Sequence, residues 1–139
     1  MRRIFIGLTP LLLAGCPSLG DRAPVDYPAH VSIRDGAVCV TVMPEADEKL
    51  EAISIYRLDE AEKRKITFFD TLQPISPNQC VPAQGYVFTE GHQYHFSAKL
   101  TSKKKSAAGD FPFSREFITE FSLKKINNNL HVDVIQKDR

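Results

Sequence analysis

Two histidines, His92 and His95, have the spacing in this sequence that comes nearest to a metal site. Three positions apart on an extended strand, the two rings would point to opposite faces, and no third ligand is evident nearby. The chain has no Gly-x-Ser-x-Gly, His-Glu-x-x-His or glycine-rich phosphate-loop motif. We therefore expect no catalytic residues, no metal and no cofactor, and we interpret the protein as a non-enzyme.

The N-terminal segment resembles the signal of a bacterial lipoprotein. Arg2 and Arg3 precede an apolar run from Ile4 to Ala14, which is shorter than the roughly 20 residues that span a bilayer. Leu13-Ala14-Gly15-Cys16 matches the bacterial lipobox at every position. The resemblance implies a signal peptide over residues 1–15 and a Cys16 that carries diacylglycerol and is N-acylated. The alternative is an ordinary secretory signal with a chance cysteine.

The residue after Cys16 bears on sorting. It is Pro17, whereas an aspartate there favours inner-membrane retention in enterobacterial lipoproteins. By this resemblance the protein faces the periplasm from the inner leaflet of the outer membrane.

The mature chain is close to neutral. Removing Arg2 and Arg3 with the signal peptide lowers the number of basic residues from 18 to 16, against 17 acidic ones. A near-neutral chain has no general attraction for nucleic acid, and no small-molecule substrate is evident.

The two other cysteines, Cys39 and Cys80, suit an exported protein. An even pair in an oxidising compartment indicates a disulfide. Two buried thiols or metal ligands are the alternative, although neither cysteine has a second ligand at zinc-site spacing.

The proline-rich residues 16–30 predict a tether, and residues 31–139 predict a single folded domain.

Alternating apolar residues predict an all-β fold for that domain. Asp35-Gly36, between two alternating runs, predicts a hairpin, and the charged residues 59–65 predict a solvated hairpin tip or one helical turn. Acidic residues that alternate with apolar ones, such as Glu120, are expected on the wet face of a sheet. The expected strands lie near residues 31–33, 38–42, 50–58, 66–69, 86–89, 94–100, 115–123 and 130–136. We expect a β-sandwich of about seven to eight strands.

Residues 88–94 (Phe-Thr-Glu-Gly-His-Gln-Tyr) resemble the tyrosine corner of immunoglobulin-like and fibronectin type III domains. There a tyrosine hydroxyl hydrogen-bonds the backbone just upstream. Glu90 stands where those domains usually have proline, and the chain lacks tryptophan and the two-cysteine hallmark of immunoglobulins. The resemblance implies a structural role for Tyr94 and an immunoglobulin-like or fibronectin III-like sandwich.

One segment has the composition of a recognition loop. Lys103, Lys104 and Lys105 stand between small and polar residues, and we expect them in a loop at one end of the sandwich. These lysines are the candidate partner-binding residues, and a merely solubilising loop is the alternative. Phe111 and Phe113 follow, and we expect them to start a strand and pack inward rather than to form an exposed aromatic anchor.

The chain resembles a group of small enterobacterial lipoproteins described as periplasmic immunity proteins of type VI secretion. The likeness rests on Leu12-Leu13-Ala14-Gly15-Cys16-Pro17, Gly20-Asp21-Arg22, Val38-Cys39-Val40-Thr41-Val42, Ile53-Ser54-Ile55-Tyr56 and Gly85-Tyr86 with Tyr94. It covers most of the mature chain. It implies a protein that binds and neutralises a toxin effector delivered into the periplasm. The alternative is a structural lipoprotein of a secretion or cell-envelope assembly.

Overall fold

The computed structural model describes residues 26–135. They form eight strands, one 3-10 helix and one short α-helix. The chain order is β1 (Asp26–Pro28), β2 (His30–Arg34), β3 (Ala37–Thr41), β4 (Lys49–Arg57), η1 (Leu58–Lys63), β5 (Lys65–Gln73), β6 (His92–Thr101), α1 (Lys103–Ala108), β7 (Ser114–Ile126) and β8 (Asn129–Val134). Within these residues no helix is long and apolar enough to cross a membrane.

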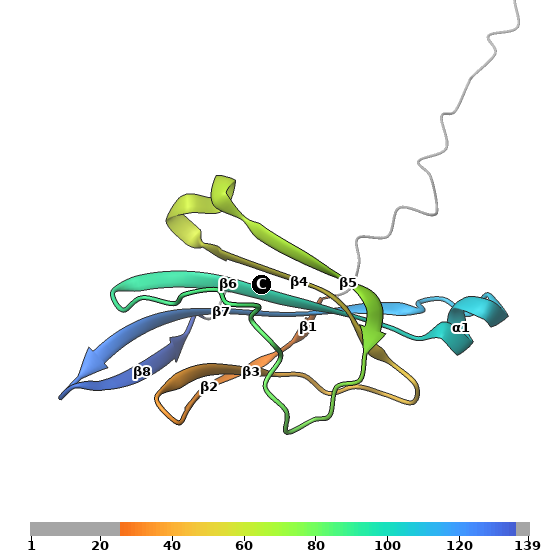
Figure 1. The fold of residues 1–139 in the computed structure, drawn as a ribbon, viewed down its shortest axis with the longest axis horizontal. Coiled ribbons are helices and arrows are strands. Elements are labelled where there is room, and N and C mark those ends of the chain that lie inside the picture. The colour runs from red at the N-terminus through yellow and green to blue at the C-terminus, as the bar shows by residue number, and fades with distance from the viewer. Residues whose placement is uncertain (1–25, 136–139) are drawn as a thin grey trace, which may run out of the picture.

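The strands form two layers of unequal size. The larger sheet has the order β1-β7-β6-β4-β5. β8 also pairs with β7, further along that strand than β1 does. The smaller sheet is the hairpin of β2 and β3. Figure 1 shows this hairpin as a separate layer below the larger sheet, with the long connection from β5 to β6 passing beside it. The all-β sandwich expected from the sequence is confirmed.

The core lies between the layers and is centred on β6. Its inward-facing residues Tyr94, Phe96, Ala98 and Leu100 are almost completely buried, because a period of two places them on one face. Burying each large apolar side chain stabilises the fold by about 1.5–3 kcal/mol. Neighbouring strands and the hairpin complete the core with Val31, Val40, Val42, Leu50, Ile53, Ile55, Phe117, Phe121 and Leu123.

The turn between β2 and β3 follows from its two residues. Asp35 and Gly36 have φ angles of 51° and 75°, and a two-residue hairpin turn of this kind requires positive φ at both positions. The strands pair antiparallel from His30 opposite Thr41 to Arg34 opposite Ala37. The predicted Asp-Gly hairpin is therefore confirmed.

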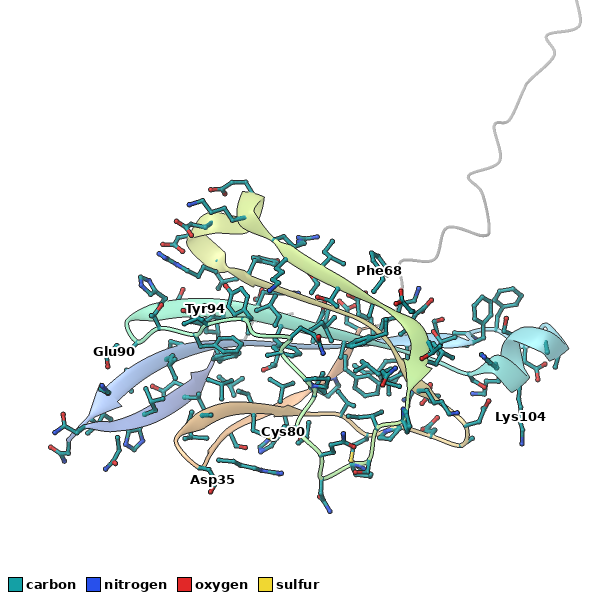
Figure 2. All side chains as sticks on the ribbon, viewed as in Figure 1. Asp35, Phe68, Cys80, Glu90, Tyr94 and Lys104 are labelled. Carbon is teal, nitrogen blue, oxygen red and sulfur yellow. A yellow bond between two sulfur atoms is a disulfide. The ribbon has the colours of Figure 1, made fainter. Side chains whose placement is uncertain are left out.

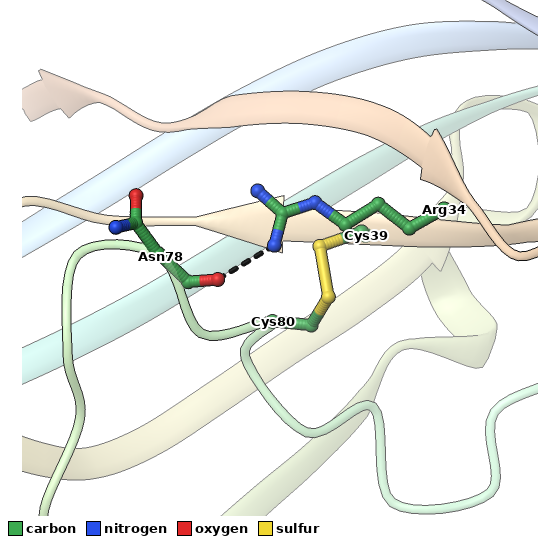
Figure 3. Close-up of a disulfide and its surroundings, with 4 residues drawn as sticks. All are labelled: Arg34, Cys39, Asn78 and Cys80. Atoms are coloured by element: carbon green, nitrogen blue, oxygen red, sulfur yellow. Dashed lines mark hydrogen bonds between the residues drawn. A yellow bond between two sulfur atoms is a disulfide. The ribbon is translucent and has the colours of Figure 1, made fainter.

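A disulfide joins this hairpin to the connection between β5 and β6. Cys39 and Cys80 are bonded, with a Cα–Cα distance of 5.1 Å (Figure 3). Beside them the Val81 N–H donates to the Val40 carbonyl at 2.7 Å, and Arg34 Nη1 donates to the Asn78 carbonyl at 2.6 Å. The predicted disulfide is confirmed, and it attaches an irregular segment to the smaller sheet.

The folded part begins earlier than the sequence indicated. Residues 26–28, expected to belong to the tether, form β1 and pair in parallel with Glu116–Ile118 of β7. The Ala29 N–H also donates to the Ile118 carbonyl at 3.0 Å. This pairing satisfies backbone groups on the edge of β7, which explains why so short a strand is ordered. The expected signal peptide and Cys16 lie outside the described residues.

The segment before β6 also departs from expectation. Residues 86–89 were predicted as a strand but form no regular structure. Tyr86 and Phe88 instead turn toward Tyr94, with ring centroids at 6.1 Å and 5.0 Å. The Tyr94 hydroxyl donates to the Thr89 carbonyl at 3.0 Å and accepts from the Thr89 N–H at 2.7 Å. This is the hydrogen bonding that the tyrosine-corner resemblance implied.

Removing the disulfide should lower stability substantially. For a double Cys39→Ala and Cys80→Ala variant, we expect the free energy of unfolding to fall by about 2–4 kcal/mol, because the bond closes a loop of roughly 40 residues in the unfolded chain. Urea unfolding measures this, and reduced wild-type protein should give the same midpoint as the variant. Equal midpoints for oxidised wild type and variant would contradict the prediction.

Tyr94→Phe should destabilise the protein while keeping the ring packing. We expect a loss of about 1–3 kcal/mol, since the part-buried backbone of Thr89 loses its partner. Thermal unfolding provides the measurement. Tyr86→Phe is the matched control, because the Tyr86 hydroxyl makes no hydrogen bond to another residue between 26 and 135, and its effect should stay within about 0.5 kcal/mol.

Candidate functional site

The three candidate lysines lie on a short helix, not in a loop as expected. α1 protrudes from one end of the sandwich between β6 and β7 (Figure 1). Ser102 caps its N-terminus by accepting from the Lys105 N–H at 3.2 Å, and Gly109 ends it with a φ of 70°. Both capping residues are encoded locally in the sequence, and they stabilise the two ends of a helix of about one and a half turns.

A distant loop holds this helix in place. Asp47, between β3 and β4, accepts hydrogen bonds from the Ser102 hydroxyl at 2.5 Å and from the Lys104 N–H at 3.1 Å. Ser102 is completely buried. The hydrogen bond from Ser102 lowers the pKa of the Asp47 carboxyl, and the bond from the Lys104 backbone lowers it further. The start of α1 is thus fixed by a carboxylate that remains ionised at neutral pH.

A buried ion pair supports the same loop. Arg115 of β7 donates to Glu48 from Nε at 2.8 Å and from Nη2 at 2.5 Å, and also donates to the Met43 carbonyl at 3.0 Å. The Arg115 guanidinium lies 4.8 Å from the ring centroids of both Tyr27 and Phe117. Burial alone raises the pKa of Glu48, but the hydrogen bonds from Arg115 and from the Glu45 backbone outweigh it, so the pKa lies below its usual range.

The aromatic residues after α1 differ from the prediction. Phe111 is 81% exposed, so it does not pack inward, and β7 begins only at Ser114. Its ring contacts that of Phe113, with centroids 5.2 Å apart. We call Lys103, Lys104, Lys105 and Phe111 the basic-aromatic tip. Figure 2 shows Lys104 pointing outward from this end of the molecule.

Ion pairs neutralise part of the second charged segment, residues 59–65. η1 makes the connection between β4 and β5, and Arg57 binds Asp59 at 2.6 Å while Lys63 lies 3.4 Å from Glu60. None of the η1 residues is buried. The segment is a solvated hairpin connection with a helical turn, which combines the two interpretations left open by the sequence.

Sequence reasoning missed a polar row on the outer face of the larger sheet. Tyr56, His95 and Glu120 are direct neighbours across β4, β6 and β7. His95 Nδ1 lies 2.8 Å from Glu120 Oε2, and the His95 ring stacks on Tyr56 with centroids 4.6 Å apart. Glu120, expected on a wet face, is only 8% exposed. Strand register brings these residues together, and no local pattern encodes that.

His92, which the sequence places three positions before His95, lies apart from this row. His92 is on the opposite face of β6 from His95, since the two are an odd number of positions apart on one strand. Between residues 26 and 135, no group of three or more His, Cys, Asp or Glu side chains could hold a metal ion.

A shallow depression lies beside the start of β6. Its volume is about 460 Å³, and its lining includes His92, Ser122, Lys124 and Asp133. Lys124 and Asp133 bind each other at 2.5 Å. This ion pair joins two of the charged side chains of the depression, and a third, Asp59, binds Arg57 at 2.6 Å.

The part of the fold from β1 to β7 corresponds to a known family, while β8 lies beyond the matched range. A family model described as a domain of unknown function (DUF7480) matches residues 26–126. The chain belongs to this family. The matched range begins with the first residue of β1 and ends with the last residue of β7, so the DUF7480 domain includes the disulfide and the basic-aromatic tip. No curated protein and no solved structure matches the chain.

The buried Glu48–Arg115 pair makes the stability of this DUF7480 domain depend on pH. Because the folded-state pKa of Glu48 lies below its ordinary 4.5, its contribution is complete above that value and is lost as pH falls through 4.5 and then through the folded pKa. We expect the free energy of unfolding to decrease from pH 6 to pH 3.

The variant Glu48→Gln should show a shallower decrease and, at pH 7, a loss of about 3 kcal/mol, because Arg115 keeps a buried charge without its partner. Denaturant unfolding across the pH range measures both effects. Glu45→Gln is the control, since Glu45 is mainly exposed and its contact with Arg115 is 3.7 Å. Parallel pH profiles for Glu48→Gln and wild type would contradict the assignment.

Proposed function

We propose that this protein is a lipid-anchored, non-enzymatic binding module of the periplasm, and that it neutralises a toxin delivered by type VI secretion. The carrying observation is the basic-aromatic tip, which places an exposed phenylalanine beside three lysines on a domain closed by a disulfide. The resemblance of the sequence to immunity lipoproteins supports the same role.

The tip has the chemistry of a protein-recognition surface. Large aromatic side chains contribute strongly to interfaces when a partner buries them, and surrounding charges steer association and select the partner. The Asp47–Ser102 contact and the Glu48–Arg115 pair hold the tip before binding, which reduces the entropy lost on association. We propose that the partner surface is an acidic cleft of the toxin.

The proposed location rests on the sequence before the domain. Several acyl chains on Cys16 would anchor the protein stably without a polybasic segment. Pro17, in place of aspartate, supports the inner leaflet of the outer membrane. A structural lipoprotein of an envelope assembly would share this location, so the test must separate the two roles.

A competition between sister cells provides that test. A strain that lacks this protein should be killed by parental cells with active type VI secretion and should survive parental cells in which secretion is inactivated. Wild-type protein supplied in trans should restore survival. A deletion strain that survives active attackers, or that loses envelope integrity without any attacker, would overturn the immunity role and favour the structural one.

The lysines of the tip should determine protection. In the same assay we expect the triple variant Lys103→Ala, Lys104→Ala and Lys105→Ala to protect about tenfold less well, because electrostatic steering and specificity are lost. The control, Lys63→Ala, Lys124→Ala and Lys125→Ala, removes the same charge from exposed positions outside the tip. Immunoblots confirm equal protein levels. Equal protection by both triple variants would contradict the role of the tip.

A further inference from the structure

The first strand of the domain contacts Arg115, the residue that supports the loop beside the tip. Tyr27 is the central residue of β1 and is partly buried, whereas its neighbours Asp26 and Pro28 are exposed. The centroid of the Tyr27 ring lies 5.6 Å from that of the Phe117 ring and 4.8 Å from the Arg115 guanidinium carbon. Only 9% of the Arg115 side chain is exposed. Because a cation attracts an aromatic face more strongly when water is excluded, the Tyr27 ring helps to hold this guanidinium in place.

Arg115 binds both ends of the loop between β3 and β4, residues 42–48. Near the start of the loop, the Met43 carbonyl accepts from Arg115 Nη2 at 3.0 Å, and at its end Glu48 accepts from Nε at 2.8 Å. The Glu48 carboxylate also accepts from the Glu45 N–H at 2.8 Å. A displacement of the guanidinium would therefore break hydrogen bonds at both ends of the loop at once.

The loop in turn holds α1 through Asp47, the residue next to Glu48. The Asp47 carboxylate accepts from the Ser102 hydroxyl at 2.5 Å and from the Lys104 N–H at 3.1 Å. None of the six residues of α1, all within the described part of the chain, is buried, and the helix projects from the end of the sandwich (Figure 1). So short a helix has little stability of its own, so its order depends on these hydrogen bonds and on its caps.

β1 is the element in this series of contacts that can separate without unfolding the core. It pairs with β7 over three residues, two of which are exposed. β7 itself pairs with β6 from Ser114 to Leu123 and with β8 from Phe121 to Ile126. Short edge elements with few buried contacts open locally, well before the domain unfolds. The pairing of β1 is thus a two-state feature that a series of contacts can couple to a distant site.

We propose that Tyr27 is a positioning residue of the basic-aromatic tip, and that the pairing of β1 with β7 orders this tip. While β1 is paired, Tyr27 holds Arg115, Arg115 holds residues 42–48, and Asp47 holds the start of α1. When β1 separates, Arg115 loses one of the two aromatic rings beside it, so the loop and then α1 loosen. The effect on protection rests on the proposed function, whereas the link between β1 and α1 is measured without any partner.

Hydrogen–deuterium exchange of the full chain, purified from its own cells in a mild detergent, tests the link. In Tyr27→Ala, peptides from residues 102–109 should exchange about tenfold faster than in wild type, because α1 opens more often. Tyr27→Phe should exchange at the wild-type rate, since the ring is kept. Peptides from the centre of β6 should exchange alike in all three proteins. Unchanged exchange at residues 102–109 in Tyr27→Ala, or an equal acceleration in β6, would overturn the proposal.

Tyr86→Ala is the matched control. Tyr86 is also partly buried against the core, but its ring contacts Phe88 and Tyr94, at the opposite end of β6 from α1. The variant should leave exchange at residues 102–109 unchanged. An acceleration equal to that of Tyr27→Ala would overturn the positioning role, because the loss of a distant aromatic ring would then loosen α1 just as well.

A background without the buried charges tests whether the link runs through Arg115. Arg115→Met with Glu48→Leu removes both charges of the buried pair, so neither charge is left without its partner. In this background Tyr27→Ala should not accelerate exchange at residues 102–109, since the two rings and the loop no longer share a guanidinium. The same tenfold acceleration in both backgrounds would overturn the route through Arg115.

The competition between sister cells separates this inference from the immunity role. At equal protein levels, Tyr27→Ala should protect about tenfold less well than wild type and Tyr27→Phe should protect fully, because a loosened tip must be ordered on binding. A deletion strain that survives active attackers would overturn the immunity role and leave the exchange result standing. Full protection by Tyr27→Ala with a loosened α1 would overturn the claim that β1 prepares the tip for its partner.

Discussion

The burial of one face of β6 is the constraint on which the rest of the molecule depends. β6 has a strand on each side, and its inward residues from Tyr94 to Leu100 belong to the same buried core as residues of the second layer. At one end the Tyr94 hydroxyl donates a hydrogen bond to the Thr89 carbonyl and fixes the incoming chain, and just past the other end the Ser102 hydroxyl donates to Asp47 of a different loop. The same strand thus organises the core, the corner before it and the helix after it.

The smaller layer depends on β6 less directly. β2 and β3 share no strand pairing with the larger sheet, so they are held by apolar contacts and by links to the connection after β5. Those links are the Cys39–Cys80 bond and the Val81–Val40 and Arg34–Asn78 hydrogen bonds. The connection itself has two buried apolar residues, Ile75 and Val81, which belong to the core.

Local patterns in the sequence were sufficient for some of these features. Asp35-Gly36 encodes its hairpin turn, and alternation predicts β6 and β7 because each strand has one buried face. The features that escaped prediction depend on distant partners. β1 is too short to show an alternation of apolar residues, and it forms because it pairs with the edge of β7. The start of α1 is held by hydrogen bonds to Asp47, more than 50 residues earlier in the chain. Glu120 is buried because the register of β6 and β7 places it beside His95.

The parallel pairing of β1 with β7 has a mechanical consequence. Any tension that reaches the domain through the chain before Asp26 acts first on three residues of strand pairing, and next on the hairpin of β2 and β3. Unravelling from that end then meets Cys39, whose covalent link to Cys80 transfers the load to the connection after β5. The domain can therefore yield by a short length of chain at its N-terminal end while the core around β6 stays intact.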